Sequence, residues 1–518
     1  MTAVLMLALL LRLVRLNDSF WLDEAAQVLE SARPLAEQLQ IAGDFQPPLM
    51  HLLTFFWLRI LALFGAKRIE ALVRFLPSVI PGIISVWASY HIALQFWPTP
   101  SASKKQHQQR QSLALMTALF MATSPLHIFY SQELRPYSLA MMWGGLSLLS
   151  LLNWTKAASA SPPPSKATKT AKSAKKNQAG FIIFNILGLY TSYLYPFWLL
   201  MQLAYLLMVK KIPWPKLIWP VSLMVIAFLP WLPKLFEQLS VGQQLQLQMP
   251  GWSGVVSLPQ LKSLPLVPLK FIYGQLNIEG SAFFVISALL IFGSLAWLLY
   301  QQRSAATSKP VLTFALYFFL APLLLIWLFS FLVPVLQPKR VLFLLPAFFI
   351  CISYLIVYTQ KQWQTLARLL FIILFAIHLF SLLAYWTKPE LQRENWRSLV
   401  AVMEADFAAK QAVAVFSFDA PFAPFVYYSH HQLATFATGS FYLPAETDLA
   451  NQVKSLADYQ VVLLFDYLRD LSDPNDQLPA LIQDLGFRQA GVYDYPNIGF
   501  VRIYTKKRVA YEYRLRCQ

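Results

Sequence analysis

Long apolar runs alternate with short polar segments along most of the chain. A helix that crosses a membrane needs about 20 mostly apolar residues. On this criterion the pattern predicts eleven spanning helices, at 2–16, 72–97, 112–130, 137–153, 180–194, 196–209, 217–232, 281–300, 311–333, 341–359 and 367–385. Unbroken apolar runs favour helices over the alternating strands of a membrane barrel. We therefore expect an all-α polytopic membrane bundle of about eleven helices over residues 1–385.

After residue 386 the pattern changes to that of a water-soluble domain. Strand-like runs occur at Ala412–Phe418, Val461–Phe465 and Phe500–Tyr504, and the stretch 391–407 has the spacing of a helix. Turn residues and helix-like segments separate these runs. The sequence therefore predicts a small α/β domain over residues 386–518.

The basic residues indicate which connections face the cytoplasm. Five connections carry Lys and Arg but no acidic residue, namely 98–111, 154–179, 210–216, 301–310 and 360–368. By the positive-inside rule these are cytoplasmic, which places the intervening connections and the C-terminal domain on the extracytoplasmic side of the plasma (inner) membrane. Within the outer 17–71 loop, the apolar segment 47–65 would invert every later loop if it crossed, so we assign it to the outer interface as an interfacial helix.

Composition agrees with a membrane protein: 57% of residues are hydrophobic and 13% are charged, with a net charge of +17. Because the cations lie in short loops, they indicate topology rather than nucleic-acid binding. The Lys-rich 154–179 segment predicts a disordered cytoplasmic loop near anionic headgroups, or a simple tether. Arg12 and Arg15 would reach the interface by snorkelling. Two cysteines, Cys351 and Cys517, predict no disulfide framework.

Carboxylates are scarce among the helices, so those at the outer face are candidates for chemistry. Glu133 ends one helix in YSQELRPY, and Asp23 and Glu24 follow the first span in FWLDEAAQ. Two carboxylates at a wet interface can deprotonate a nucleophile or hold a divalent cation. The alternative for Asp23 is a helix cap.

Cations accompany these carboxylates on the side that the positive-inside rule disfavours. Arg135 lies two residues after Glu133, and Lys339 and Arg340 open a span in LQPKRVLFLLP. Phosphate is a natural partner for such groups, while salt bridges or lipid headgroups are the alternative. His51 and His127 could bind a metal, but isolated histidines beside apolar residues are more often hydrogen-bonded structural residues.

The motifs RLNDSFWLDEA, FQPPL, RFLPS and SPLHIFYSQELRPYSL, in this order, resemble the bacterial branch of the dolichyl-phosphate-mannose protein mannosyltransferase family, which includes the lipid A aminoarabinose transferases. The resemblance covers the N-terminal third; QPKRVLFLLP and the NWRS entry to the last domain extend it. It implies the GT-C fold. It also matches Asp23 and Glu24 to the first-loop acidic position and Glu133 to the second. Gln46 stands where aminoarabinose transferases have Lys, which puts donor contacts or sugar identity in doubt.

The resemblance implies an inverting transfer of a sugar from a polyprenyl-phosphate donor to a lipid, glycan or protein acceptor outside the cytoplasm. Asp23 would be the base or would orient the acceptor, and Arg135, Tyr137, Lys339 and Arg340 would bind the donor phosphate. No nucleotide is implied, and a divalent metal stays open. The main alternative is a transporter or flippase of a lipid-linked or anionic substrate, which predicts inverted repeats and broken helices at mid-membrane. A lipid-linked-oligosaccharide ligase or polymerase would share the fold, whereas a nonenzymatic receptor leaves Glu133 unexplained.

Overall fold

The computed structural model describes residues 1–41, 43–65, 69–95, 104–159, 164–248, 261–276, 281–302, 309–417, 422–438 and 446–506. It divides into two compact units, which are described separately. The first comprises Met1–Leu16, Pro34–Leu239 and Val256–Thr387, and the second comprises Asn17–Arg33, Ser240–Val255 and Lys388–Gln518. The C-terminal part of the second unit begins at Lys388, and the start of the first loop belongs with it. The domain bounds given by the sequence stay predictions.

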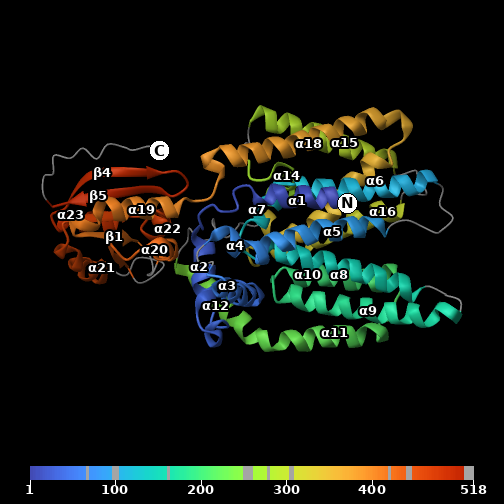
Figure 1. Cartoon of the computed structure of the whole chain (residues 1–518), viewed down its shortest axis with the longest axis horizontal. Helices are drawn as coiled ribbons and strands as arrows, with labels where there is room; N and C mark the ends of the chain where they lie inside the picture. The colour runs from blue at the N-terminus through green and yellow to red at the C-terminus, as the bar shows by residue number, and fades with distance from the viewer. Residues whose placement is uncertain are drawn as a thin grey trace. The chain divides into compact units, whose positions relative to one another are not determined.

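The first unit is helical, and each of the eleven predicted apolar runs coincides with a helix. Its helices include α1 (Thr2–Leu13), α3 (Leu49–Leu63), α4 (Glu70–Arg74), α5 (Ile80–Leu94), α6 (Lys104–Thr123), α7 (Pro125–Ser131), α8 (Tyr137–Ala158), α9 (Pro164–Leu189), α10 (Tyr195–Ala204), α11 (Pro215–Phe228), α12 (Leu232–Gln248), α14 (Ser263–Tyr273), α15 (Ala282–Gln302), α16 (Lys309–Phe329), α17 (Leu345–Val357) and α18 (Gln364–Thr387). Figure 1 shows α5, α8, α9, α10 and α11 running in nearly the same direction. The chain is a multi-pass membrane protein.

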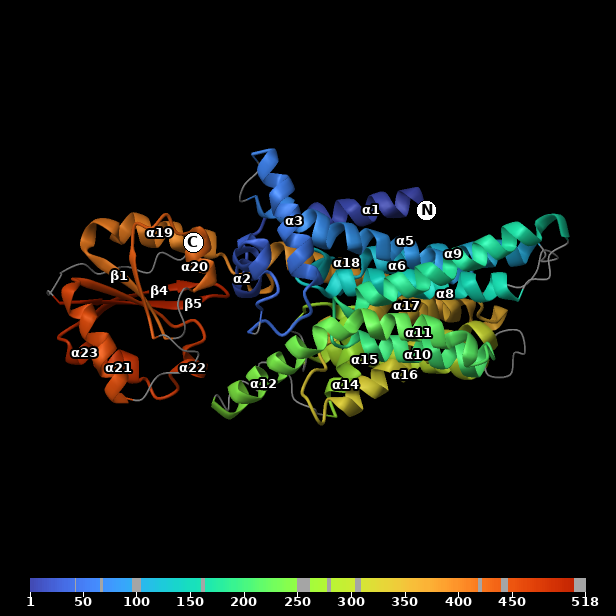
Figure 2. The ribbon, with the colours of Figure 1, turned by 90° about the horizontal axis from the view of Figure 1, so that it is seen from below.

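Length and composition qualify six of the described helices as membrane spans, or seven if the bent pair α6 and α7 is one span. The remaining predicted segments are shorter or less apolar helices, so the count of eleven crossings stays a prediction. Helix α3 lies steeply across the direction of the bundle helices (Figure 2), an orientation that agrees with the predicted interfacial position. That position also stays a prediction.

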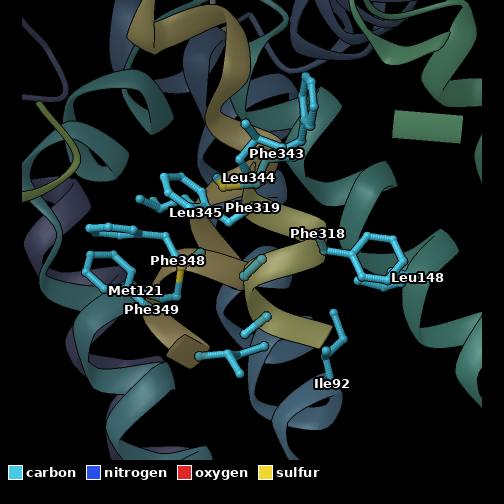
Figure 3. Close-up of a cluster of buried hydrophobic side chains, with 14 of the residues drawn as sticks. Ile92, Met121, Leu148, Phe318, Phe319, Phe343, Leu344, Leu345, Phe348 and Phe349 are labelled. Carbon is cyan, nitrogen blue, oxygen red and sulfur yellow. The ribbon is translucent and has the colours of Figure 1, made fainter. Parts of the chain in front are cut away.

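The core of the first unit is built around the segment that follows Lys339 and Arg340. A 3-10 turn (Pro338–Leu344) leads into α17. Nearly all side chains of α17 are buried, whichever face of the helix they are on. Phe349 stacks on Phe120 of α6 at 5.5 Å, and Phe348 packs against Phe319 of α16 at 5.1 Å. Figure 3 shows Phe319, Phe348 and Phe349 between the surrounding helices. A helix that is apolar all round belongs in the centre of a bundle, and α17 has that position.

The prediction that the Arg12 side chain snorkels to the interface is wrong. Its side chain is fully buried, and Nη1 donates to the carbonyl oxygens of Ala8 (2.9 Å) and Ala122 (3.2 Å). Helix α6 ends at Thr123, and the chain bends by 58° into α7. Because Pro125 has no N–H for the carbonyl of Met121, other groups bond to the end of α6: His127 Nδ1 lies 2.8 Å from the Met121 carbonyl oxygen, and Arg12 bonds to the carbonyl of Ala122.

Two further segments differ from the sequence prediction. Residues 164–179, expected to be disordered, form the first turns of α9, while 160–163 lie outside the described residues. The outer connection 233–280 contains α12 and α14, which we did not predict. Both helices lack an apolar run of spanning length, so the hydropathy criterion does not detect them.

The second unit is a five-stranded mixed sheet with helices on both faces. Its strands are β1 (Ala412–Phe416), β2 (Ala434–Ala437), β3 (Val461–Phe465), β4 (Arg488–Tyr495) and β5 (Gly499–Thr505), in the order β2-β1-β3-β5-β4. β1 pairs in parallel with β2 and β3, whereas β5 is antiparallel to β3 and β4. The strands predicted at Val461–Phe465 and Phe500–Tyr504 are confirmed. The strand predicted at Ala412–Phe418 ends at Phe416, because Ser417 is in a bend; Phe418 lies outside the described residues.

Alternate residues of the central strands pack against different helices. Ala414 and Phe416 of β1 face the cluster that contains residues of α19 (Trp396–Phe407) and α20 (Ala423–Tyr428), while Val413 and Val415 face α21 (Glu446–Val453) and α23 (Gln477–Asp484). Figure 2 shows α19 and α20 on one side of the sheet and α21, α23 and α22 (Arg469–Ser472) on the other. Because both faces are covered, β1 and β3 are apolar throughout rather than alternating.

Candidate active site

A tight turn between α7 and α8 fixes Glu133 and Arg135 in the first unit. The backbone N–H of Arg135 donates to the carbonyl of Glu133 (2.8 Å), and the hydroxyl of Ser78 donates to the same carbonyl (2.6 Å). Ser138, in the first turn of α8, donates to the carbonyl of Ser78 (2.9 Å). Ser78 belongs to the RFLPS motif, which forms one π-helical turn before α5. Two of the sequence motifs thus hold the turn that carries Glu133, whose side chain is only 2% exposed.

The predicted phosphate-binding residues Lys339 and Tyr137 meet beside this turn. The ammonium of Lys339 lies 5.6 Å from the centre of the Tyr137 ring, a cation–π contact. The Tyr137 ring packs edge-on against Tyr130 at 5.2 Å, and the Tyr130 hydroxyl is within electrostatic range of both Lys339 and Glu133. The structure therefore gathers Glu133, Tyr137 and Lys339 around Tyr130.

Arg340 follows Lys339 but makes a different contact. Its Nη1 donates to the carbonyl of Val335 (3.3 Å), in the loop that leads into the 3-10 turn. The side chain is partly exposed. Arg340 thus occupies the turn that carries Lys339.

Asp44 is a carboxylate of the first unit that sequence reasoning missed. Its Oδ2 accepts hydrogen bonds from His51 Nε2 (2.7 Å) and Gln46 Nε2 (2.5 Å), and its Oδ1 lies 3.5 Å from Arg135 Nη2. Burial alone would raise the pKa of Asp44, but the charge of Arg135 and the hydrogen bond from His51 hold the pKa below its ordinary value. Asp44 is therefore an anion that connects the first-loop motif DFQPPLMH to Arg135.

A buried amide holds the loop that carries Asp44. Gln238 of α12 donates from Nε2 to the carbonyls of Ile41 (2.6 Å) and Asp44 (2.6 Å), and its Oε1 accepts from the Tyr193 hydroxyl (2.5 Å). The only local signal for Asp44 is its place two residues before Gln46.

Asp23 and Glu24 lie in the second unit, at the start of α2 (Leu22–Ala32). The Glu24 side chain is completely buried, and its Oε2 lies 3.5 Å from Arg393 Nη1, which is also buried. Asp23 is partly exposed, and it interacts electrostatically with Glu394 and Tyr467. The neighbouring carboxylates thus occupy different environments.

Comparison with solved structures shows similarity along nearly the whole chain. ArnT from Cupriavidus metallidurans bound to undecaprenyl phosphate gives a TM-score of 0.55 at 12% identity, covering 98% of this chain and 98% of ArnT. The oligosaccharyltransferase AglB from Archaeoglobus fulgidus, in complex with an inhibitory peptide and a dolichol-phosphate, gives 0.51 at 12% identity over 98% of this chain and 74% of AglB. The chain has the GT-C fold. No family model matches the sequence, and neither does any curated protein.

The shared fold confirms the fold class that the motif order implied. At 12% identity the likeness concerns the path of the chain, not the residues of the site. A second AglB structure, in complex with Zn and sulfate, has a TM-score of 0.51 at 13% identity, covering 97% of this chain and 73% of AglB. The roles of the individual side chains must therefore be argued from this chain's own geometry.

Proposed function

We propose that the chain is a membrane glycosyltransferase that moves a sugar from a polyprenyl-phosphate donor to an acceptor on the extracytoplasmic side of the plasma membrane, with inversion. One observation carries the proposal: the chain shares its fold over 98% of its length with an ArnT that is bound to undecaprenyl phosphate. The cations and carboxylate around the turn between α7 and α8 support it, because they suit a phosphorylated donor.

The first unit supplies the groups that suit the lipid phosphate. Lys339 offers an ammonium beside the Tyr137 ring, and Arg135 and Arg340 offer planar guanidinium forks. When the sugar leaves, negative charge grows on the phosphate oxygen, and fixed cations stabilise that charge more in the transition state than in the ground state. Glu133 would orient these cations or bind the donor sugar.

Asp23 would act as the base toward the acceptor. In a single displacement, the acceptor hydroxyl oxygen forms a bond to the anomeric carbon while the bond from that carbon to the phosphate oxygen breaks. The hydroxyl proton passes to the Asp23 carboxylate, and polyprenyl phosphate leaves with the bonding electrons. Asp23 suits this role better than Glu24, because Glu24 is completely buried against Arg393.

Asp44 and His51 are the residues of the first unit that fit a divalent cation. Carboxylate oxygen and imidazole nitrogen are common zinc ligands. His51 Nε2 and Asp44 Oδ2 lie 2.7 Å apart, and a cation bound by both would replace the proton of their hydrogen bond. A cation bound there would add positive charge toward the donor phosphate. Metal dependence is tested by chelation with EDTA, followed by activity and by direct metal analysis of the purified protein.

The acceptor is a lipid, a glycan or a protein hydroxyl. We propose to test the function with purified protein in lipid vesicles and a polyprenyl-phosphate sugar as donor, and to compare polyprenyl-phosphate sugars and envelope glycans by mass spectrometry with and without the gene. Accumulation of the donor together with loss of one glycan modification is expected. Transport of intact donor across vesicles without sugar transfer would instead establish a flippase.

A further inference from the structure

The start of the first loop is attached to the C-terminal domain by its backbone. The backbone N–H of Arg397 donates to Ser19 Oγ (3.1 Å), and Arg397 Nη2 donates to the carbonyl of Asn17 (3.0 Å). The N–H of Phe20 donates to the Tyr428 hydroxyl (2.7 Å), and the Phe20 ring packs edge-on against Tyr427 at 5.3 Å. These contacts fix the chain as far as Phe20, two residues before α2.

The first turn of α2 has no cap of its own. Trp21 occupies the cap position and makes no side-chain hydrogen bond to the helix, although the first backbone N–H groups of a helix need acceptors. Glu394, from the C-terminal domain, accepts a hydrogen bond from the N–H of Leu22. A carboxylate at this position also interacts favourably with the helix dipole, so Glu394 caps α2 from a distant part of the sequence.

The Glu394 carboxylate is itself held in place by two aromatic donors. Trp396 Nε1 donates to Oε2 (2.7 Å), and the Tyr467 hydroxyl donates to Oε1 (2.8 Å). Trp396 is completely buried and packs edge-on against the Tyr467 ring at 5.2 Å. The acceptor for Leu22 is therefore built into the core of the second unit.

The adjacent residue makes the second attachment. Arg393 pairs with Glu24 at 3.5 Å, and both side chains are buried. Breaking a buried ion pair by removing one partner is strongly destabilising. Consecutive residues of the C-terminal domain thus hold Leu22 and Glu24, the residues on either side of Asp23.

We infer that Glu394 is a positioning residue for Asp23: the C-terminal domain holds the first turn of α2 and thereby fixes the carboxylate that acts in transfer. The inference rests on the proposed function. It gives the sheet domain a role in turnover, and it explains why Glu24 is buried while Asp23 stays partly exposed.

The test compares Glu394→Gln with Glu404→Gln in the purified full-length protein. Glu404 is a matched control, because it is a buried carboxylate of the same domain that accepts hydrogen bonds from Ser429 Oγ (2.8 Å) and the N–H of His430 (2.9 Å), which lie in the segment after α20 rather than in α2. Misplacing a reacting group by 1 Å can cost about a hundredfold in rate. We expect Glu394→Gln to lower kcat by about ten- to a hundredfold with KM for the donor unchanged, and Glu404→Gln to leave kcat within about twofold.

Hydrogen exchange supplies a readout that needs no activity. Glu394→Gln should raise deuterium uptake in residues 17–33, whereas Glu404→Gln should not. In an Asp23→Asn background, Glu394→Gln should cause no further loss of transfer, because a positioning residue acts through the group it positions. If Glu394→Gln does not fold, Tyr467→Phe removes one hydrogen bond to the same carboxylate and should give a smaller change of the same kind.

Equal kcat and equal uptake over residues 17–33 in Glu394→Gln and Glu404→Gln would overturn the inference. A wild-type protein that transfers no sugar, while Glu394→Gln alone raises uptake over 17–33, would overturn the proposed function and leave the attachment of α2 standing. Additive losses for Asp23→Asn and Glu394→Gln would also contradict positioning.

Discussion

The candidate groups of the two units carry opposite charge. In the first unit, Arg135, Lys339 and Arg340 outnumber the carboxylates Asp44 and Glu133. In the second unit, Asp23, Glu24 and Glu394 gather at the start of α2, and Arg393 pairs with one of them. A set of fixed cations suits an anion such as phosphate, whereas a carboxylate suits a proton from a hydroxyl.

The two units also hold their groups by different means. In the helical unit, Glu133 and Arg135 lie on a turn between two helices. Backbone carbonyls around this turn accept hydrogen bonds from serine hydroxyls. In the sheet unit, the side chain of Glu394 accepts a hydrogen bond from the backbone N–H of Leu22. Donor binding should therefore depend on changes in the first unit and acceptor activation on changes in the second.

The comparison predicts an all-or-none result for topology. A reporter fused after Lys172, in the basic start of α9, should be cytoplasmic, and one fused after Asp406, in α19, should be extracytoplasmic. The reason is the alternation of basic connections along the chain. Alkaline phosphatase and green fluorescent protein fusions measure this directly. Both fusions on one side would contradict the eleven-span topology.

The largest kinetic effect is expected at Asp23. Asp23→Asn keeps the shape and removes the charge, so transfer should fall by about a hundred- to ten-thousandfold, the range typical of a lost general base. Asp494→Asn is the control, because Asp494 is an exposed carboxylate of β4 in the same unit. Turnover is measured in lipid vesicles with a polyprenyl-phosphate sugar. Near-normal turnover in Asp23→Asn would assign this carboxylate to helix capping alone.

Hydropathy was enough to predict where the bundle helices lie but not how they pack. The spans Pro338–Val357 and Ala282–Gln302 have almost equal mean hydropathy, 2.3 and 2.4, yet 78% of the first window and 17% of the second are buried in protein. Lipid and protein interior are both apolar, so the sequence does not distinguish a central helix from one that faces lipid.

The residues of the candidate site that belong to sequence motifs were predictable. Those whose importance depends on tertiary contacts were not. Glu133 and Lys339 were predicted from charge in an apolar setting, and the structure places both within electrostatic range of Tyr130. Asp44 and Glu394 were missed because each stands in a polar stretch where acidic residues are common. Their significance comes from partners far away in the sequence, such as Arg135 for Asp44.

Arg340→Gln tests whether the first unit binds the donor phosphate. Charged hydrogen bonds contribute about 1.5–3 kcal/mol, so the expected loss in kcat/KM is about ten- to a hundredfold, with weaker donor binding. Arg340→Lys should recover part, because an ammonium does not reproduce the guanidinium fork. Lys388→Gln, which changes an exposed cation outside the site, is the control. Unchanged kcat/KM in Arg340→Gln would shift the phosphate role to Arg135.

The smallest expected effect is a pH dependence of the stability of the second unit. Burial raises the pKa of Glu394 to about 7 from 4.5, against the hydrogen bonds from Trp396 and Tyr467, and the charge of Asp23 adds to the increase. Among the described residues, Asp23 on α2 and Tyr467 after β3 are the titratable groups that act on it. Because the pKa of Glu394 is higher in the folded than in the unfolded protein, protonated Glu394 stabilises the folded state. This contribution is fully present below about pH 4.5 and is lost as pH rises through about 7.

We therefore expect the thermal unfolding midpoint of the full-length protein to fall by a few degrees between about pH 5 and pH 8, and this fall to be smaller in Glu394→Gln. Glu404 is the control for this pH dependence. Its hydrogen bonds outweigh its burial and lower its pKa. Its contribution is lost only as pH falls below its ordinary range, so Glu404→Gln should remove none of the fall that Glu394 causes between about pH 5 and pH 8. Equal slopes in Glu394→Gln and the wild type would show that Glu394 is ionised throughout, with its three hydrogen-bond donors outweighing its burial.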